Sequence, residues 1–268
     1  RLGFDDGLID APWKTRSDDY EEQIADIDRQ IADLEERRAH YEADRQQALD
    51  QQSLLEGNLS KMQAARSDLQ EQLKKLERFN GQQPAAGVTK KPWSYVDAPV
   101  TNAEGERDPR VYKVVLDQFA VGSNNRYRMN QQGKGETYCN IYVWDATRAM
   151  GAEIPHWVDA DNNPASPGQG NYELSANRSI KWLETRGADE GWQVVTSAEE
   201  AQSIANEGHP VVATYENSGG IGHVAMVRPG EYSDADGPRI AQAGGTNFND
   251  GTIKDGFGDR PVVYYMHN

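Results

Sequence analysis

The stretch GETYCNIYVWDATRAMG, residues 135–151, contains the one cysteine among the 268 residues of the chain. Its apolar spacing after a glycine-rich start predicts a helix that begins near Thr137 or Cys139 and stops at Gly151. Unpaired N–H groups and the dipole at a helix N-terminus stabilise a thiolate, which is the nucleophilic form of cysteine. Cys139 is therefore either a buried apolar filler or a reactive thiol, and its possible partners must be sought elsewhere in the sequence.

A reactive thiol needs a base, and His223 is the best-placed histidine. It opens the alternating run HVAMV directly after the glycine-rich stretch SGGIG, residues 218–222. Catalytic groups are often presented where a loop meets a rigid sheet; the alternative is a histidine that only closes a sheet edge. The other histidines offer less: His40 falls in a polar helical segment, His209 in a turn and His267 at the chain end, and nothing specifies a role for His156.

A Cys–His pair needs a third polar group that fixes the orientation of the imidazole. Gln242 is the preferred candidate, because it is the polar residue in the otherwise apolar run IAQA on the next expected strand. Its amide oxygen would accept the ring N–H of His223. Asn247, which follows at the end of that strand, is the alternative.

The regions around these residues predict an α+β fold. Residues 175–187 and 197–208 are expected to form helices that end at glycine, and residues 110–121 form either a helix or a strand. Four strand-like runs follow, at residues 210–216, 222–229, 239–244 and 261–267, with turn residues between them. Helices followed by successive strands indicate a domain with an antiparallel sheet.

Residues 17–80 have a different pattern, with no proline and one glycine. Apolar residues recur every seventh position from Tyr20 to Leu76, and a companion series from Ile24 to Leu73 is half polar, so the segment predicts a coiled-coil helix. The heptad phase continues through Gly57, which favours one long helix over a helical hairpin. Such a stripe needs a partner helix, and we expect a homo-oligomer formed by a second copy.

The remaining segments complete the expected domain organisation. Residues 1–16 form an N-terminal tail and residues 81–109, rich in proline and glycine, a linker that Trp93 and Tyr95 anchor on the next domain. Residues 110–268 form the globular domain. The chain starts at Arg1 and shows no signal peptide, so we expect a processed or trimmed form.

Charge and hydropathy exclude several partners. The net charge of −15 argues against nucleic acid and anionic membranes, which bind through Lys and Arg. No apolar run approaches the roughly 18 residues needed to span a bilayer. The run DADNNP, residues 159–164, lacks the central glycine and the closing glutamate of a calcium loop, and we interpret it as a polar turn. We expect no metal.

The order of these motifs resembles the papain-like CHAP and NlpC-like cell-wall hydrolases. YCNIYVWDATRAMG, GHVAMV and IAQAGG carry the resemblance, which covers roughly residues 120–268. It implies a papain-like fold, no cofactor, and Cys139 as nucleophile, His223 as base and Gln242 as the orienting residue, with the imidazole protonated in a resting ion pair. Gln242 stands where CHAP proteins usually carry a carboxylate. By the same resemblance, Gln131 or Gln132 would donate to the oxyanion. Tyr127 either lines the substrate groove or packs in the core, and packing is the preferred interpretation.

The expected function is a cysteine peptidase or amidase that cleaves amide bonds in bacterial peptidoglycan. The resemblance places such a protein outside the cell, at the envelope, or on a phage or secretion particle. One alternative is an interaction protein whose coiled coil carries the function beside an inactive papain-like binding domain. Another is a papain-like toxin that acts on a different amide.

Overall fold

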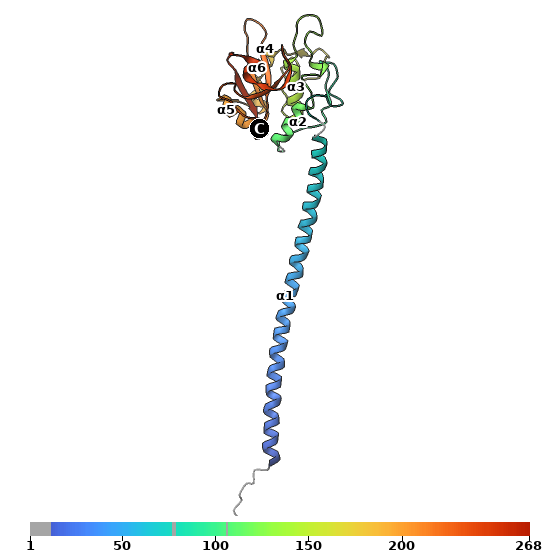
Figure 1. Cartoon of the computed structure of the whole chain (residues 1–268), viewed down its shortest axis with the longest axis vertical. Helices are drawn as coiled ribbons and strands as arrows, with labels where there is room; N and C mark the ends of the chain where they lie inside the picture. The colour runs from blue at the N-terminus through green and yellow to red at the C-terminus, as the bar shows by residue number, and fades with distance from the viewer. Residues whose placement is uncertain (1–11, 77–78, 106) are drawn as a thin grey trace, which may run out of the picture. The chain divides into compact units, whose positions relative to one another are not determined.

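The computed structural model describes residues 12–76, 79–105 and 107–268, and the chain divides into two compact units. The first extends to Glu71 and the second begins at Gln72. The described residues of the first unit all belong to helix α1, Pro12–Leu76, which continues without a break through Gly57 (Figure 1). At 1.5 Å per residue, its 65 residues extend about 100 Å. The prediction of one long helix is therefore confirmed over the hairpin.

The apolar stripe of α1 is open to solvent. Among the described residues, the large apolar ones at heptad positions range from 48% exposed at Ile31 to 72% at Met62. Polar side chains pair along the helix, as in the ion pair between Arg38 and Glu42 at 2.9 Å, and His40 lies on the surface, as expected, 3.6 Å from Asp44. None of the helices in the described ranges is long and apolar enough to cross a membrane.

The second unit is an α+β domain built on a six-stranded antiparallel sheet with the order β3-β8-β4-β5-β6-β7. The strands are β3 (Trp192–Val195), β4 (Val211–Tyr215), β5 (His223–Val227), β6 (Arg239–Gln242), β7 (Phe248–Thr252) and β8 (Val263–His267). A two-stranded ribbon pairs β1 (Trp157–Val158) with β2 (Tyr172–Glu173). The antiparallel sheet confirms the coarse fold class, and four of the strands match the four predicted runs.

The helices of this unit are α2 (Pro109–Asp117), α3 (Cys139–Ala149), α4 (Ala176–Arg186), α5 (Ala198–Asn206) and α6 (Ile253–Phe257), with short 3₁₀ turns η1 (Asn125–Tyr127) and η2 (Gly187–Glu190). α3 begins at the cysteine, and Gly151, at φ +67°, ends it in a left-handed conformation that suits glycine. The residues of α3 are almost all buried, which makes it the central helix of the core.

The predicted linker is packed into the second unit. Val88 is fully buried, and the backbone N–H of Ala85 donates to Gln118 at 2.8 Å. Tyr95 anchors the segment as expected, because its ring lies 5.2 Å from that of Trp144 and its hydroxyl donates to the Ala165 carbonyl. This stretch, despite its linker composition, therefore helps to build the domain.

Candidate active site

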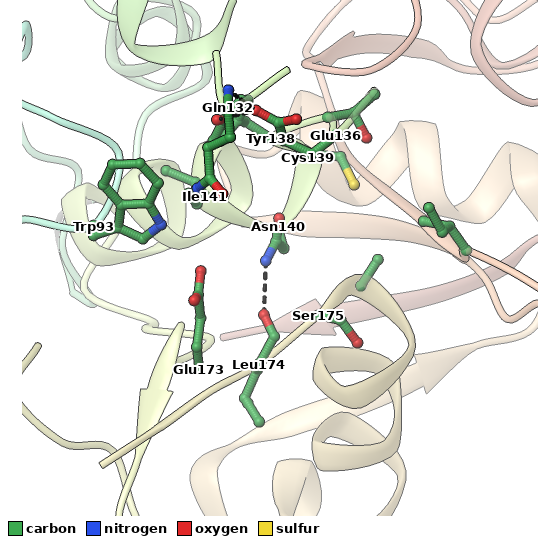
Figure 2. Close-up of a pocket in the computed structure, with 13 residues that line it drawn as sticks. Trp93, Gln132, Glu136, Tyr138, Cys139, Asn140, Ile141, Glu173, Leu174 and Ser175 are labelled. Carbon is green, nitrogen blue, oxygen red and sulfur yellow. Dashed lines mark hydrogen bonds between the residues drawn. The ribbon is translucent and has the colours of Figure 1, made fainter. Parts of the chain in front are cut away.

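Cys139 lies at the first residue of α3 and lines a pocket of about 340 Å³ (Figure 2). The residue is only 2% exposed, so the thiol is at the edge of the core. Figure 2 shows its sulfur on the side of the pocket opposite Trp93. Tyr138 provides no side-chain cap for the first N–H groups of α3, and those of Cys139 and Asn140 act on the thiol itself.

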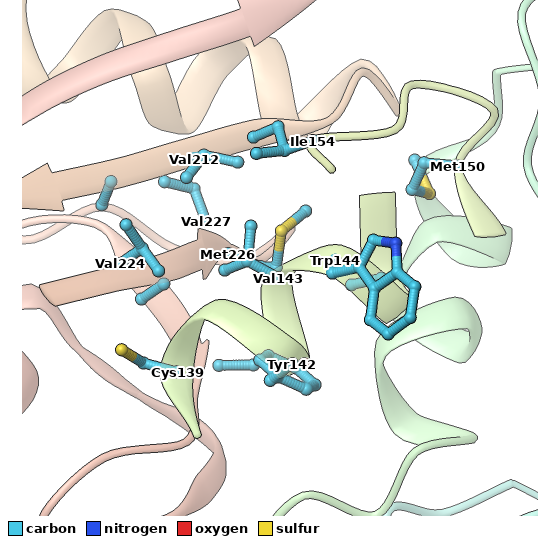
Figure 3. Close-up of a cluster of buried hydrophobic side chains, with 14 of the residues drawn as sticks. Cys139, Tyr142, Val143, Trp144, Met150, Ile154, Val212, Val224, Met226 and Val227 are labelled. Carbon is cyan, nitrogen blue, oxygen red and sulfur yellow. The ribbon is translucent and has the colours of Figure 1, made fainter. Parts of the chain in front are cut away.

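The packing of α3 on the sheet brings the thiol to the start of β5. Figure 3 shows Cys139 and Val143 of α3 in one buried cluster with Val224 and Met226 of β5. The backbone N–H of Val224, the residue after His223, acts on the thiol and lowers its pKa. Two residues that are 84 positions apart in the sequence thus lie on adjoining elements at the same end of the sheet.

The environment of the thiol favours its neutral form. Burial raises the pKa of Cys139, and hydrogen bonds from the N–H groups of Val224 and Asn140 and from the Thr137 hydroxyl only partly offset this effect. The helix N-terminus therefore does not by itself produce a resting thiolate, because desolvation outweighs it.

His223 is held by Gln242. The imidazole Nε2 lies 2.7 Å from Gln242 Oε1, and Gln242 Nε2 donates to the Thr246 carbonyl at 2.9 Å. Since that second bond fixes the amide, Oε1 faces the ring and Nε2 carries the proton, which leaves Nδ1 as the basic nitrogen. A Cβ at Gly256 would stand 2.3 Å from Gln242 Oε1, so glycine there makes room for the glutamine.

Burial lowers the pKa of His223, and the charge of Arg260 lowers it further. The hydrogen bond to Gln242 raises this pKa, but its effect is smaller than that of burial. Both pKa directions oppose the resting ion pair expected from the resemblance. The pKa directions instead favour a neutral thiol and a neutral imidazole. With both groups neutral, attack by the thiol would require a general base.

The thiol and the imidazole open into different pockets that share Ile221. The imidazole pocket, of about 360 Å³, is also lined by Gln242 and Arg260. Ile221 is 73% exposed and lines both pockets. Within the part of the chain that the structure describes, no hydrogen bond joins Cys139 to His223. Catalytic hydrogen bonds are often long before substrate binds.

The alternative residues have other roles or remain candidates. Asn247 accepts from the Gly244 N–H and donates to the Tyr127 carbonyl, so it closes a turn and does not contact the imidazole. Tyr127 is fully buried and its hydroxyl donates to Asp145, so it packs in the core, as preferred, and does not line the groove. Gln131 donates its amide to two backbone carbonyls. Gln132 lines the thiol pocket and remains the candidate oxyanion donor.

Sequence reasoning missed a polar chain beside the thiol. Asn140 Nδ2 donates to the Leu174 carbonyl at 2.7 Å and lies 3.2 Å from His156 Nδ1. His156, 1% exposed, contacts Glu173 Oε1 through Nε2 at 2.8 Å. A polar residue directly after the cysteine was the one available signal, since the other two members come from distant segments.

The polar turn at residues 159–164 forms as interpreted. Asp159 Oδ1 accepts the N–H groups of Asp161 and Asn163, both at 2.9 Å. Among the described residues, no three His, Cys, Asp or Glu side chains are grouped as metal ligands would be.

No family model matches this chain, and no curated protein matches it.

The neutral thiol predicts how Cys139 reacts with iodoacetamide. We expect slow alkylation at neutral pH that accelerates as the pH rises, because burial raises the pKa of the thiol and only the thiolate reacts. The chain has one cysteine, so the mass of the intact protein reports this residue alone. Protein unfolded in urea provides the reference rate. A rate already maximal below neutral pH would instead indicate a resting ion pair.

Proposed function

We propose that this chain is a cysteine-dependent hydrolase with a papain-like domain that cleaves amide bonds in bacterial peptidoglycan. The observation that carries the proposal is the placement of Cys139 at the start of α3, in contact with the start of β5, where Gln242 holds the imidazole of His223. Peptidoglycan as the substrate rests on the resemblance of the three motifs to cell-wall hydrolases, which also supports action outside the cell or at the envelope.

The mechanism follows from the neutral pair. As Cys139 Sγ attacks the amide carbonyl, its proton passes to His223 Nδ1, and the carbonyl oxygen becomes an oxyanion. The N–H groups at the start of α3 and the Gln132 amide would stabilise that oxyanion. The imidazolium then protonates the leaving amine, and a thioester remains.

Water completes the reaction. His223 takes a proton from water as the water oxygen attacks the thioester carbonyl. The C–S bond breaks, and the proton returns to the sulfur. The products are a carboxylic acid, an amine and the original thiol. Gln242 keeps the ring orientation through both proton transfers, since it binds Nε2–H and leaves Nδ1 free to accept and return the proton.

The test is digestion of purified sacculi with the full chain. We expect new free amines to appear with time, and mass spectrometry of the released fragments identifies the cleaved bond and separates an amidase from an endopeptidase. Hydrolysis would be contradicted if sacculi release no new amines over a range of pH and a general cysteine peptidase substrate also stays intact.

One observation favours a second candidate, an inactive papain-like binding domain. Cys139 is 2% exposed and has a raised pKa, as expected of a structural thiol. In that case the coiled coil would carry the function. The two candidates differ in one result: a binding domain retains peptidoglycan affinity and releases no amines.

Variants of Gln242 are expected to shift the pH profile in opposite directions. Gln242→Leu removes a bond that raises the pKa of His223, so the acidic limb of kcat/KM should move to lower pH, with a loss of about 10- to 100-fold in rate from ring misorientation. Gln242→Glu places a carboxylate beside the ring and should move that limb to higher pH. Equal profiles for both variants would contradict the general-base role of His223.

We propose that the stripe on α1 mediates self-association. Residues such as Ile24, Ile27 and Leu34 are about half exposed or more, and burying them against another helix would be favourable. We expect light scattering to give a mass that rises with concentration for the full chain and a monomer after deletion of residues 1–71. A monomeric full chain at every concentration would contradict this proposal.

A further inference from the structure

Glu173 is the charged group with an open oxygen in the thiol pocket. The charged side chains that line this pocket are both carboxylates, Glu136 and Glu173. The two differ in their bonding. Glu136 accepts from the backbone N–H groups of Gln132 and Lys134 and from the Tyr138 hydroxyl. Although desolvation raises it, these bonds lower the pKa of Glu136 to about 2. The Glu136 carboxylate is therefore already occupied by hydrogen bonds within its own loop.

Glu173 is held from one side only. His156 Nε2 lies 2.8 Å from its Oε1, and the Glu173 side chain is 44% exposed. Within the described residues, its Oε2 has no hydrogen-bond partner. Figure 2 shows the carboxylate pointing toward Trp93 and Asn140 across the pocket. One oxygen is thus fixed by the protein and the other is available to a bound molecule.

The group that fixes Glu173 is itself fixed. The His156 ring is fully enclosed, 5.2 Å from the ring of Trp144, and Asn140 Nδ2 faces its Nδ1 at 3.2 Å. Asn140 is oriented in turn by its bond to the Leu174 carbonyl. Because Nδ1 accepts, Nε2 carries the proton and donates to the carboxylate. A buried histidine that orients a half-exposed carboxylate is typical of a preorganised binding group.

The surroundings of Glu173 suit a positive charge. The Trp93 indole also lines the pocket, and an indole face attracts a cation when the two are in contact. Burial raises the pKa of Tyr138 to about 12, and the charges of Glu136 and Glu173 contribute to that rise, so both carboxylates act on the same part of the pocket. Among the residues that the structure describes, no lysine or arginine lines the pocket to neutralise them.

We propose that Glu173, oriented by His156, is a specificity-determining residue that binds the ammonium group of the substrate beside the amide attacked by Cys139. This inference rests on the proposed hydrolase function and narrows its substrates to those with a free amine near the cleaved bond. In a stem peptide, that amine is either the N-terminal amine or the side-chain amine of a diamino acid.

The test measures binding without chemistry, by calorimetry with the full-length Cys139→Ala protein. The probes are a synthetic stem tetrapeptide with lysine at its third position and two forms of it, acetylated at the N-terminal amine or at the lysine side chain. We expect one acetylation to weaken binding by about tenfold or more, as for loss of a partly desolvated ion pair. The acetylation that does so identifies the amine.

Adding Glu173→Gln tests the residue itself, since glutamine can still accept the His156 N–H but carries no charge. We expect this variant to bind the free and the acetylated peptides equally, within about twofold, while Glu190→Gln, an exposed control away from the pocket, keeps the difference. Equal affinity of the three peptides for the Cys139→Ala protein, absence of binding included, would overturn the proposal. A difference that survives Glu173→Gln would overturn it as well.

Sacculus digestion by the wild type separates this inference from the function on which it rests. If the protein discriminates between the peptides but releases no amines from sacculi, the hydrolase proposal fails and amine recognition stands. If it releases amines but binds all the peptides equally, amine recognition fails and the hydrolase proposal stands.

Discussion

Replacing Cys139 with alanine is expected to reduce amine release from sacculi by at least about 10,000-fold, because the variant has no nucleophile to form the thioester. The oxyanion donors and the His223–Gln242 pair remain in place, so any residual rate reflects positioning and polarisation of the substrate alone. The measurement is the initial rate of amine release at equal protein concentration.

The control for this variant is its fold. Alanine in a site where cysteine is 2% exposed removes one sulfur atom from the edge of the core, which costs on the order of 1 kcal/mol. Circular dichroism and the unfolding midpoint should therefore stay close to those of the wild type. Amine release by a folded Cys139→Ala protein at the wild-type rate would show that the chemistry lies elsewhere.

Replacing Asp145 with alanine is expected to destabilise the second unit by about 3–5 kcal/mol. Arg126 and Asp145 form a fully buried ion pair with two contacts, at 2.6 and 2.9 Å. The same guanidinium donates to the carbonyls of Lys90, Lys91 and Ser94. Without the carboxylate, a buried cation loses its counter-charge and the attachment of residues 90–94 weakens.

Urea unfolding followed by tryptophan fluorescence measures this effect, since Trp144 is 1% exposed in the same core. The matched control is Arg110→Ala, which removes an exposed ion pair with Asp108 and should leave the midpoint nearly unchanged. An Asp145→Ala protein as stable as that control would mean that the buried pair contributes little to the packing of residues 81–109.

The elements that could be predicted from the sequence are those with a strong local pattern. The heptad series specified α1, and the alternating apolar runs specified β4, β5, β6 and β8. Strands β3 and β7 were missed because they are partly polar; FNDGT in β7 has no alternation, and its pairing with β6 shifts in register. Their strand state is set by neighbours in the sheet, which local propensity does not report.

The residues of the candidate site also fall into those that a local sequence pattern reveals and those that only the fold brings together. Cys139, His223 and Gln242 were accessible because each opens or interrupts an element with a clear pattern. For Tyr127 the sequence left a groove position open beside the preferred core position, because an aromatic residue suits both; the structure buries it, with its hydroxyl bonded to Asp145, 18 positions away. The chain from Asn140 through His156 to Glu173 joins three separate segments, and only the fold brings them together.

The direction of the pKa shift of Cys139 could also not be predicted from the local sequence. A helix N-terminus alone predicts a stabilised thiolate at Cys139, and the packing of α3 on β5 reverses that preference through desolvation. How deeply a residue is buried is a tertiary property, so its effect on a pKa follows from the fold.

Trapping the covalent intermediate tests the central claim most directly. The full chain is mixed with a stem peptide that it cleaves, quenched in acid within one turnover and analysed by peptide mass spectrometry. The proposed mechanism predicts that the peptide containing Cys139 gains the mass of the acyl fragment as a thioester, and that Cys139→Ala shows no adduct. Cleavage that proceeds while Cys139 stays unmodified at every quench time would contradict it.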